Sequence, residues 1–213
     1  MFEDRNDAGT QLAKKLTKFK EENVVVLAIP RGGLPVGAQV AKSLQAPLDV
    51  VLTKKIGYPT NKEYAIGAIS LESIVLTNAM GIEKSYIDQE TARIRKTLRD
   101  RHNQYYKHQS PANLKNKTVI IVDDGVATGN TLLATIELVY KQNPSKIVIA
   151  IPVAPASAIY KISNTENVDE VICILIPDNF RAVGQFYKKF EQVTDQKAIQ
   201  ILEKTNSKKT LDL

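Results

Sequence analysis

Apolar residues follow two alternating patterns along this chain of 213 residues. Continuous apolar runs, such as residues 24–29 and 119–122, are typical of strands buried on both faces. Between such runs, apolar residues recur every three or four positions, as in residues 36–44, which is typical of a helix packed on one side. The alternation predicts an α/β fold in which helices flank both faces of a parallel sheet.

The same patterns place the other elements of this sheet. Leu12, Leu16 and Phe19 follow one another at helical spacing and predict a first helix. Further elements are predicted as strands at residues 50–53, 147–151 and 171–176, and as helices at residues 132–139 and 156–162.

Two regions interrupt the alternation. Residues 64–70 and 74–77 are strand-like runs joined by a short turn, which predicts an antiparallel excursion from the sheet. Residues 85–109 predict a long helix with a thin apolar stripe and a basic face. We expect the basic face to be solvated, with a lid or partner surface beside the site as the alternative. The stripe is formed by Ile87, Ile94, Leu98 and Tyr105, and the basic face by Arg93, Arg95, Arg99 and Arg101.

Composition narrows the class of protein. Apolar residues make up 43% of the chain, which suits one folded domain. The single cysteine, Cys173, lies in an apolar run, so we expect a packed core thiol and a reducing, cytoplasmic environment. No apolar run approaches the ~20 residues of a membrane-spanning helix, so no membrane partner is expected. The net charge of +6 is scattered along the chain, so nucleic acid is not expected as a partner.

The strongest chemical signal is the segment 119–131, VIIVDDGVATGNT. An apolar strand leads into Asp123 and Asp124 and then into a glycine-bearing turn that opens a helix. Adjacent carboxylates repel each other, so ribose hydroxyls and a hydrated Mg²⁺ would suit them. Unpaired N–H groups at a helix N-terminus, with the hydroxyls of Thr128 and Thr131, suit a phosphate. A turn aspartate and a capping threonine account less well for the whole pattern.

A second strand end carries a cation. Residues 30–33, PRGG, place Arg31 and exposed backbone donors at Gly32 and Gly33 after a buried strand, which suits a pyrophosphate. The spacing of these glycines does not match the G-x-G-x-x-G motif of dinucleotide-binding folds.

Lys54 and Lys55 follow the predicted strand 50–53. They could balance pyrophosphate charge, with solvated surface lysines as an equal alternative. Two histidines and one cysteine are too few for an expected zinc site, and no serine lies in a nucleophile elbow.

The segment 119–131 resembles the phosphoribosyl pyrophosphate (PRPP) signature of type I phosphoribosyltransferases. The resemblance implies that Asp123 and Asp124 face the ribose hydroxyls and meet Mg²⁺ mainly indirectly. It matches residues 30–33 to the family's pyrophosphate loop, which often contains a cis peptide, and Lys54 to the start of a flexible loop that closes over the reacting centre. The loop that it implies for the 5-phosphate consists of Gly125, Val126, Ala127, Thr128, Gly129, Asn130 and Thr131.

Residues 176–187 resemble the hood of 6-oxopurine phosphoribosyltransferases, in which an aromatic residue stacks on the base. Phe180 is the matching residue, with a core phenylalanine as an equal alternative. The match fails at Ala127, where those enzymes have an acid, and at Val168, where they have a purine-reading lysine. An acceptor other than hypoxanthine or guanine is therefore implied.

Most of the chain is similar to a group of predicted phosphoribosyltransferases whose acceptor is unassigned. This resemblance implies one domain over residues 1–213, with a hood near residues 176–190 and an insertion near residues 55–110.

The resemblance implies a Mg²⁺-dependent enzyme that transfers a phosphoribosyl group from PRPP to a small nitrogenous acceptor and releases pyrophosphate. Asp123 and Asp124 would stabilise the positive ribose, and Arg31 the departing anion. A homodimer is expected from the same resemblance. The alternative is a non-catalytic sensor of PRPP or a nucleotide, whose basic helix binds RNA or a protein partner. Hydrolysis of a phosphoribosyl compound is a weaker third hypothesis.

Overall fold

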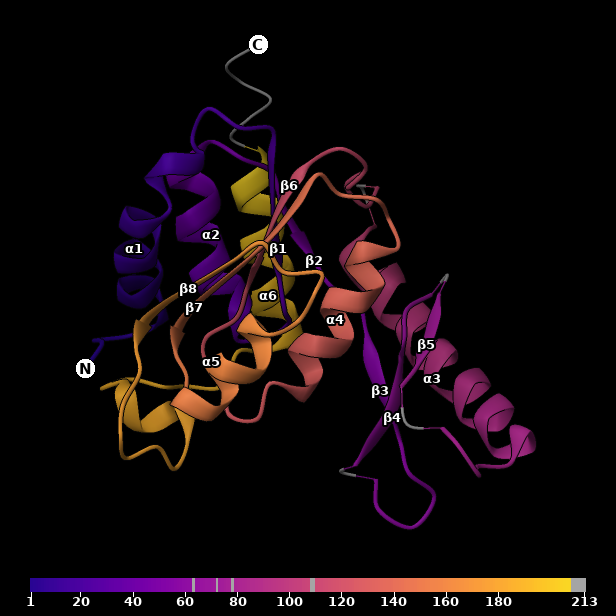
Figure 1. Cartoon of the computed structure of the whole chain (residues 1–213). Helices are drawn as coiled ribbons and strands as arrows, with labels where there is room; N and C mark the ends of the chain where they lie inside the picture. The colour runs from indigo at the N-terminus through magenta and orange to yellow at the C-terminus, as the bar shows by residue number, and fades with distance from the viewer. Residues whose placement is uncertain (63, 72, 78, 108–109, 208–213) are drawn as a thin grey trace.

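A computed structural model describes residues 1–62, 64–71, 73–77, 79–107 and 110–207. Its centre is a five-stranded parallel sheet in the order β2-β1-β6-β7-β8 (Figure 1). The parallel sheet predicted from the alternating pattern is confirmed. Its strands are β1 (Val24–Ala28), β2 (Leu48–Val50), β6 (Thr118–Val122), β7 (Lys146–Val153) and β8 (Glu170–Leu175).

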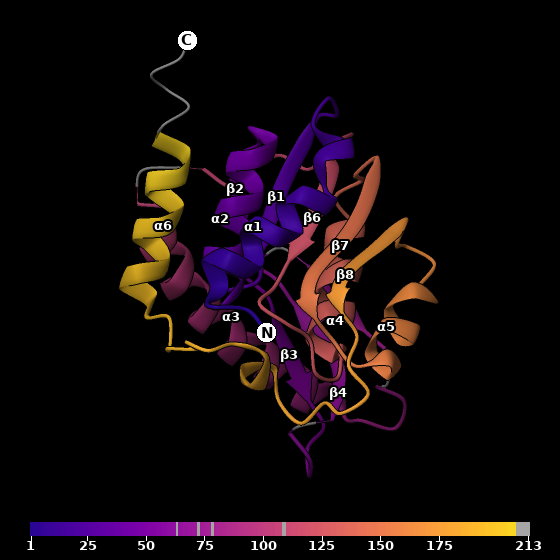
Figure 2. The same ribbon diagram turned by 90° about the vertical axis from the view of Figure 1, so that its left-hand side faces the viewer.

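Helices cover both faces of the sheet, as predicted (Figure 2). Because successive side chains of a strand point to opposite faces, Val24 and Val26 of β1 join one core cluster, and Val25 and Leu27 join the other. The first cluster is covered by α1 (Arg5–Lys15), α2 (Gly33–Leu44) and α6 (Asp195–Ser207), and the second by α4 (Asn130–Tyr140) and α5 (Ala156–Ser163).

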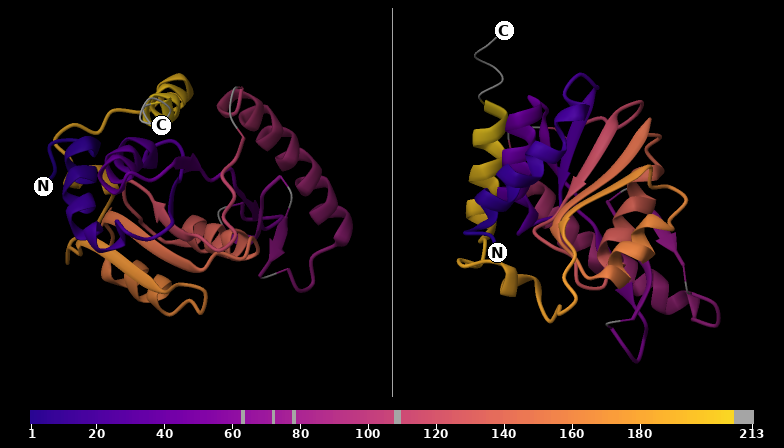
Figure 3. Two further views of the ribbon diagram at one scale, coloured as in Figure 1. Left: turned by 90° about the horizontal axis from the view of Figure 1, so that it is seen from above. Right: turned by 60° about the vertical axis from the view of Figure 1, so that its left-hand side comes forward.

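Between β2 and β6 the chain builds a smaller unit beside the central sheet (Figure 3). An antiparallel sheet in the order β3-β4-β5 buries Ile56 and Ile66 in one cluster with Ile94 and Leu98 of a long helix. The predicted antiparallel excursion and basic helix are both present, but the helix ends at Tyr105 instead of residue 109. Residues 108 and 109 of the predicted helix lie outside the described residues. The elements are β3 (Lys54–Gly57), β4 (Ala65–Ile69), β5 (Ile74–Leu76) and α3 (Lys84–Tyr105).

The α3 helix has 22 residues, which is long enough to span a membrane, but many of its side chains are charged. Across the described part of the chain, no helix combines the length and the apolar character needed to cross a membrane.

The structure corrects one strand and its neighbours. The strand predicted at residues 50–53 is Leu48–Val50, and Lys54 and Lys55 open β3 instead of following a strand of the central sheet. The apolar pattern places this strand too late along the chain because Asp49, the middle residue of β2, is polar, although its exposed fraction is only 5%.

Asp49 ties the segment beyond α3 to the central sheet. Its carboxylate accepts hydrogen bonds from the Tyr106 hydroxyl, from Ala112 N–H at 2.6 Å and from Val50 N–H at 2.7 Å. Burial raises the pKa of Asp49, and these three hydrogen bonds oppose that rise. A buried acid with three donors therefore serves as the anchor at which the chain returns from the smaller unit.

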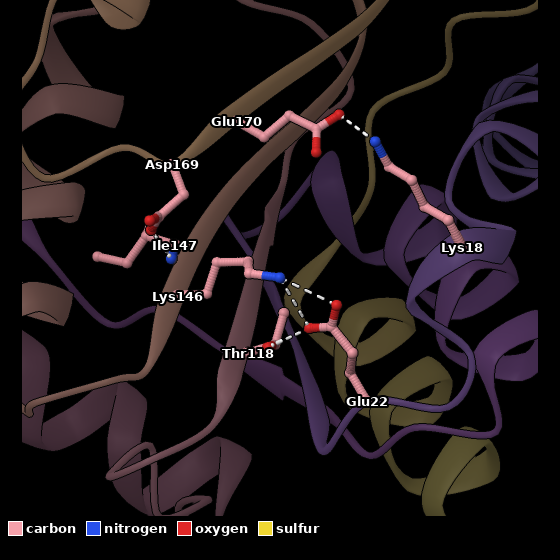
Figure 4. A network of polar contacts seen from close by, with 7 residues as sticks. All are labelled: Lys18, Glu22, Thr118, Lys146, Ile147, Asp169 and Glu170. Carbon is pink, nitrogen blue, oxygen red and sulfur yellow. Dashed lines mark hydrogen bonds and ion pairs between the residues drawn. The ribbon is translucent and has the colours of Figure 1, made fainter.

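Charged side chains at the amino edge of the central sheet pair with one another (Figure 4). Lys146 Nζ lies 2.9 Å from Glu22 Oε1, and the Thr118 hydroxyl donates to Glu22 Oε2 at 2.5 Å. Mainly because Thr118 donates this hydrogen bond, the pKa of Glu22 is lowered. Lys18 pairs with Glu170 at 2.5 Å. These charges are satisfied within the protein, which favours the opposite edge for a charged ligand.

The anchor at Asp49 gives a first prediction. We expect Asp49→Ala to lower the free energy of unfolding by at least about 2 kcal/mol, because three donors lose their buried acceptor. Asp88→Ala on the exposed surface of α3 is the control and should change stability little. Urea denaturation of both variants measures the difference, and equal stabilities would contradict the anchoring role.

Candidate functional site

The two loops with the strongest chemical signals follow neighbouring strands. β1 and β6 pair in parallel, and the chain leaves β1 towards β2 on one side and β6 towards β7 on the other. Such a switch of direction leaves a crevice beyond the carboxyl ends of the two strands, where α/β proteins bind ligands. Ile29 N–H donates to Val122 O at 2.8 Å and joins the loops where they begin.

The two loops approach so closely that a Cβ at either glycine would crowd the opposite loop. The Pro30–Arg31 peptide bond is cis. A Cβ added to Gly32 would lie 2.1 Å from Asp124 Oδ2, and one added to Gly33 would lie 2.7 Å from Val122 O. The chain at residues 30–33 thus brings its backbone against the acid pair.

The adjacent acids Asp123 and Asp124 have different surroundings. Asp124 N–H donates to Asp123 Oδ1 at 2.8 Å. Burial, and next the negative charge of Asp124, raise the pKa of Asp123 well above its usual range. Asp124 Oδ2 instead accepts from Arg5 Nε at 2.7 Å. Asp124 therefore has its own cation, whereas Asp123 is destabilised as an anion.

The predicted phosphate loop divides into a structural and an accessible part. Val126 N–H donates to Val153 O at 2.9 Å, and a Cβ on Gly125 would lie 2.5 Å from Val183 Cγ1, so these two positions are used within the fold. Ala127, Thr128 and Thr131 are exposed at the start of α4, and Gly129 precedes the helix with φ of 76°. No side chain caps α4. Asn130 Oδ1 accepts from Lys161 Nζ at 2.6 Å.

Arg31 is held at the start of α6. Its Nη1 lies 3.3 Å from Asp195 Oδ2, and Asp195 Oδ1 accepts from the Tyr105 hydroxyl at 3.3 Å. Both distances are long, so these contacts can exchange for contacts to a ligand.

A cavity of about 350 Å³ brings several predicted residues together. Arg31, Gly32 and Asp124 line it, which joins the predicted pyrophosphate loop to the acid pair. The sequence did not point to the other residues of this cavity, which are Arg5, Phe190, Gln192 and Val193.

A larger cavity, of about 1300 Å³, lies between α1, α2 and α6. It shares Arg5, Gln192 and Val193 with the smaller cavity, but none of the predicted site residues lines it. We therefore place the site at the smaller cavity, where the chemical groups converge.

Asp123, Gly33 and residues 125–131 belong to the same two loops but do not line this cavity, and three further predicted residues lie elsewhere. Lys54 and Lys55 belong to β3 of the smaller sheet and do not line the cavity at Asp124. Phe180 stacks on Phe186, with ring centres 5.5 Å apart, and does not line it either. Whether these residues meet a ligand stays a prediction.

Carboxylate oxygens of Asp123 and Asp124 are the hard donors that Mg²⁺ prefers. Among the described residues, no group of three or more His, Cys, Asp or Glu side chains could hold a metal ion. The donor set thus fits a Mg²⁺ that is bound mainly through a ligand's phosphates and water, with the two aspartates at its margin.

A glycine-bearing loop at the switch point of a parallel sheet is where many α/β proteins bind phosphate groups. A model of the phosphoribosyl transferase domain matches residues 3–191. The chain therefore belongs to this family, as its resemblance implied.

Similar proteins support the same assignment. Two proteins from strains of Mycobacterium tuberculosis, both provisionally named phosphoribosyl transferases, are 36% identical to this chain over 211 residues. The match covers 97% of this chain and 47% of theirs, so the chain spans about half the length of these curated relatives.

Solved structures share the fold. TT1426 from Thermus thermophilus has a TM-score of 0.89 and 38% identity, covering 96% of this chain and 98% of that one. A Neisseria gonorrhoeae protein crystallised with bound ppGpp has a TM-score of 0.52 over 96% of this chain and 94% of its own. At 13% identity, the second likeness is one of fold alone.

The close approach of the loops gives a second prediction. We expect Gly32→Ala to weaken PRPP binding at least about tenfold, because its Cβ would displace the Asp124 carboxylate. Gln89→Ala, at an exposed position of α3, is the control, since alanine fits a helix there without strain. Isothermal titration with PRPP and Mg²⁺ measures both variants, and wild-type affinity in Gly32→Ala would contradict the crowding.

Proposed function

We propose that this protein is a Mg²⁺-dependent phosphoribosyltransferase that moves a phosphoribosyl group from PRPP to a nitrogen acceptor. The observation that carries the proposal is the shared cavity of Arg31, Gly32 and Asp124 at the switch point of the sheet. The uncapped start of α4 lies on the same loop and supplies donors for the 5-phosphate of the ligand.

In the proposed reaction, the bond between ribose C1 and the pyrophosphate oxygen breaks while the acceptor nitrogen bonds to C1. Asp124 accepts hydrogen bonds from the ribose hydroxyls, and its negative charge stabilises the positive charge that develops at C1. Arg31 binds the departing pyrophosphate. A bound Mg²⁺ would neutralise part of the pyrophosphate charge. The protein thus acts by placing charges and holding geometry.

We propose the class of acceptor from two positions at which this sequence differs from 6-oxopurine phosphoribosyltransferases. Ala127 and Val168 stand where 6-oxopurine enzymes have an acid and a lysine, which favours an acceptor other than hypoxanthine or guanine. Phe180 remains the proposed aromatic neighbour of the base, and a homodimer the proposed assembly.

The rival function is a PRPP or nucleotide sensor that binds RNA through α3. The exposed Arg99 favours it, but Arg93 already pairs with Glu90 at 2.8 Å, which reduces the charge that this face offers. Binding of labelled RNA at several salt concentrations separates the two functions, since phosphate-driven binding weakens steeply as salt rises.

Asp124 gives the third prediction. We expect Asp124→Asn to lower kcat by about 10²-fold or more, because one preorganised charge is lost at the reacting centre. Glu166→Gln is the matched control, because it removes a negative charge on an exposed turn before β8, at the amino edge of the sheet. Pyrophosphate release measures turnover, and unchanged turnover in Asp124→Asn would remove the proposed role.

A panel of acceptors gives the fourth prediction. We expect the protein, with PRPP and Mg²⁺, to release pyrophosphate only when one of a set of purines, pyrimidines or small amines is added. Pyrophosphate and ribose 5-phosphate formed without an acceptor would indicate hydrolysis instead. PRPP binding without turnover would support the sensor.

A further inference from the structure

An arginine at the start of α1, Arg5, contacts Asp124 of the acid pair. Arg5 opens α1, and its Nε lies 2.7 Å from Asp124 Oδ2, a residue 119 positions further along the chain. The exposed fractions of the two side chains are only 11% and 14%. An ion pair that is so little exposed is weakly screened by water, so Arg5 and Asp124 hold each other firmly in place.

The position of Arg5 is fixed from several sides. Its Cζ lies 3.8 Å from the centre of the Phe190 ring, and its Nη1 donates to Glu191 O at 2.7 Å. The backbone segments on either side are also joined, since Phe2 N–H donates to Phe186 O and Lys188 N–H to Phe2 O, both at 2.8 Å. The guanidinium is thus preorganised, and ordering it on ligand binding costs little entropy.

Arg5 and Arg31 line the same cavity beside Gly32. A guanidinium has five N–H donors. The hydrogen bonds of the described residues occupy Nε and Nη1 of Arg5, which leaves Nη2 for a ligand. Two guanidinium groups around one small cavity match a pyrophosphate better than a neutral sugar, because Arg binds phosphate oxygens in paired hydrogen bonds.

We propose that Arg5 is a binding residue for the pyrophosphate part of PRPP, acting as a second cation that lines the same cavity as Arg31. Asp124 then takes the ribose hydroxyls while Arg5 remains at its side. This role rests on the proposed function, in that PRPP is the ligand of the site. The proposed role also explains why residues 2–5 are bonded to residues 186–191: these contacts hold the guanidinium of Arg5 in place.

The test compares three ligands by isothermal titration in the presence of Mg²⁺: PRPP, inorganic pyrophosphate and ribose 5-phosphate. In Arg5→Gln we expect the Kd of PRPP and of pyrophosphate to rise about 10- to 100-fold. The Kd of ribose 5-phosphate, which lacks the pyrophosphate, should rise less than about threefold. Lys20→Gln, at an exposed position distant from the acid pair in the fold, removes the same charge as a control.

Each outcome decides between roles. Equal weakening of all three ligands would mean that Arg5 only supports the fold, and unchanged or tighter binding of pyrophosphate would mean that it blocks the site; either result overturns the proposal. If Arg5→Gln does not fold, Arg5→Lys replaces it, with a smaller loss in the same order of ligands. A wild-type protein that binds pyrophosphate but not PRPP would overturn the proposed function and this role of Arg5 with it, whereas wild-type binding of PRPP that Arg5→Gln leaves unchanged would overturn the role of Arg5 alone. Wild-type protein that binds neither would overturn both.

Discussion

The pairing of β1 with β6 is the constraint on which the candidate site depends. Because the chain departs from these two strands in opposite directions, their loops face each other at the carboxyl edge with no helix between them. Gly32 then lies against the carboxylate of Asp124, which a Cβ would displace, and Gly33 lies against the backbone at Val122. The backbone hydrogen bonds between β1 and β6 therefore bring the loop that carries Arg31 next to Asp123 and Asp124.

The features that the sequence predicted well are local. Residues 24–29 and 119–122 are apolar throughout because helices cover both faces of these strands. Such runs can be recognised in the sequence alone. The phosphate-loop chemistry lies in one continuous segment, 123–131, so its composition was informative by itself. Once the strand order placed residues 30–33 beside it, the two halves of the site followed from general rules of α/β sheets.

The features that the sequence did not predict depend on contacts between distant segments. Asp49 is a buried polar residue whose three hydrogen-bond donors lie next to it and 57 to 63 residues further along the chain. The α6 helix has few apolar residues, with only Ala198 and Leu202 buried, so its periodicity was weak. Arg5 looked like one charge in a polar N-terminus, because nothing in the surrounding residues indicates a partner more than a hundred positions away.

Asp195 links the smaller unit to the candidate site through side-chain contacts. Its two oxygens connect the end of α3, through Tyr105, to the guanidinium of Arg31. If PRPP binds as proposed, its pyrophosphate would compete with Asp195 for Arg31 and would release this carboxylate. Ligand binding and the contact between Tyr105 and Asp195 would then be thermodynamically linked, each biasing the other by the same free energy.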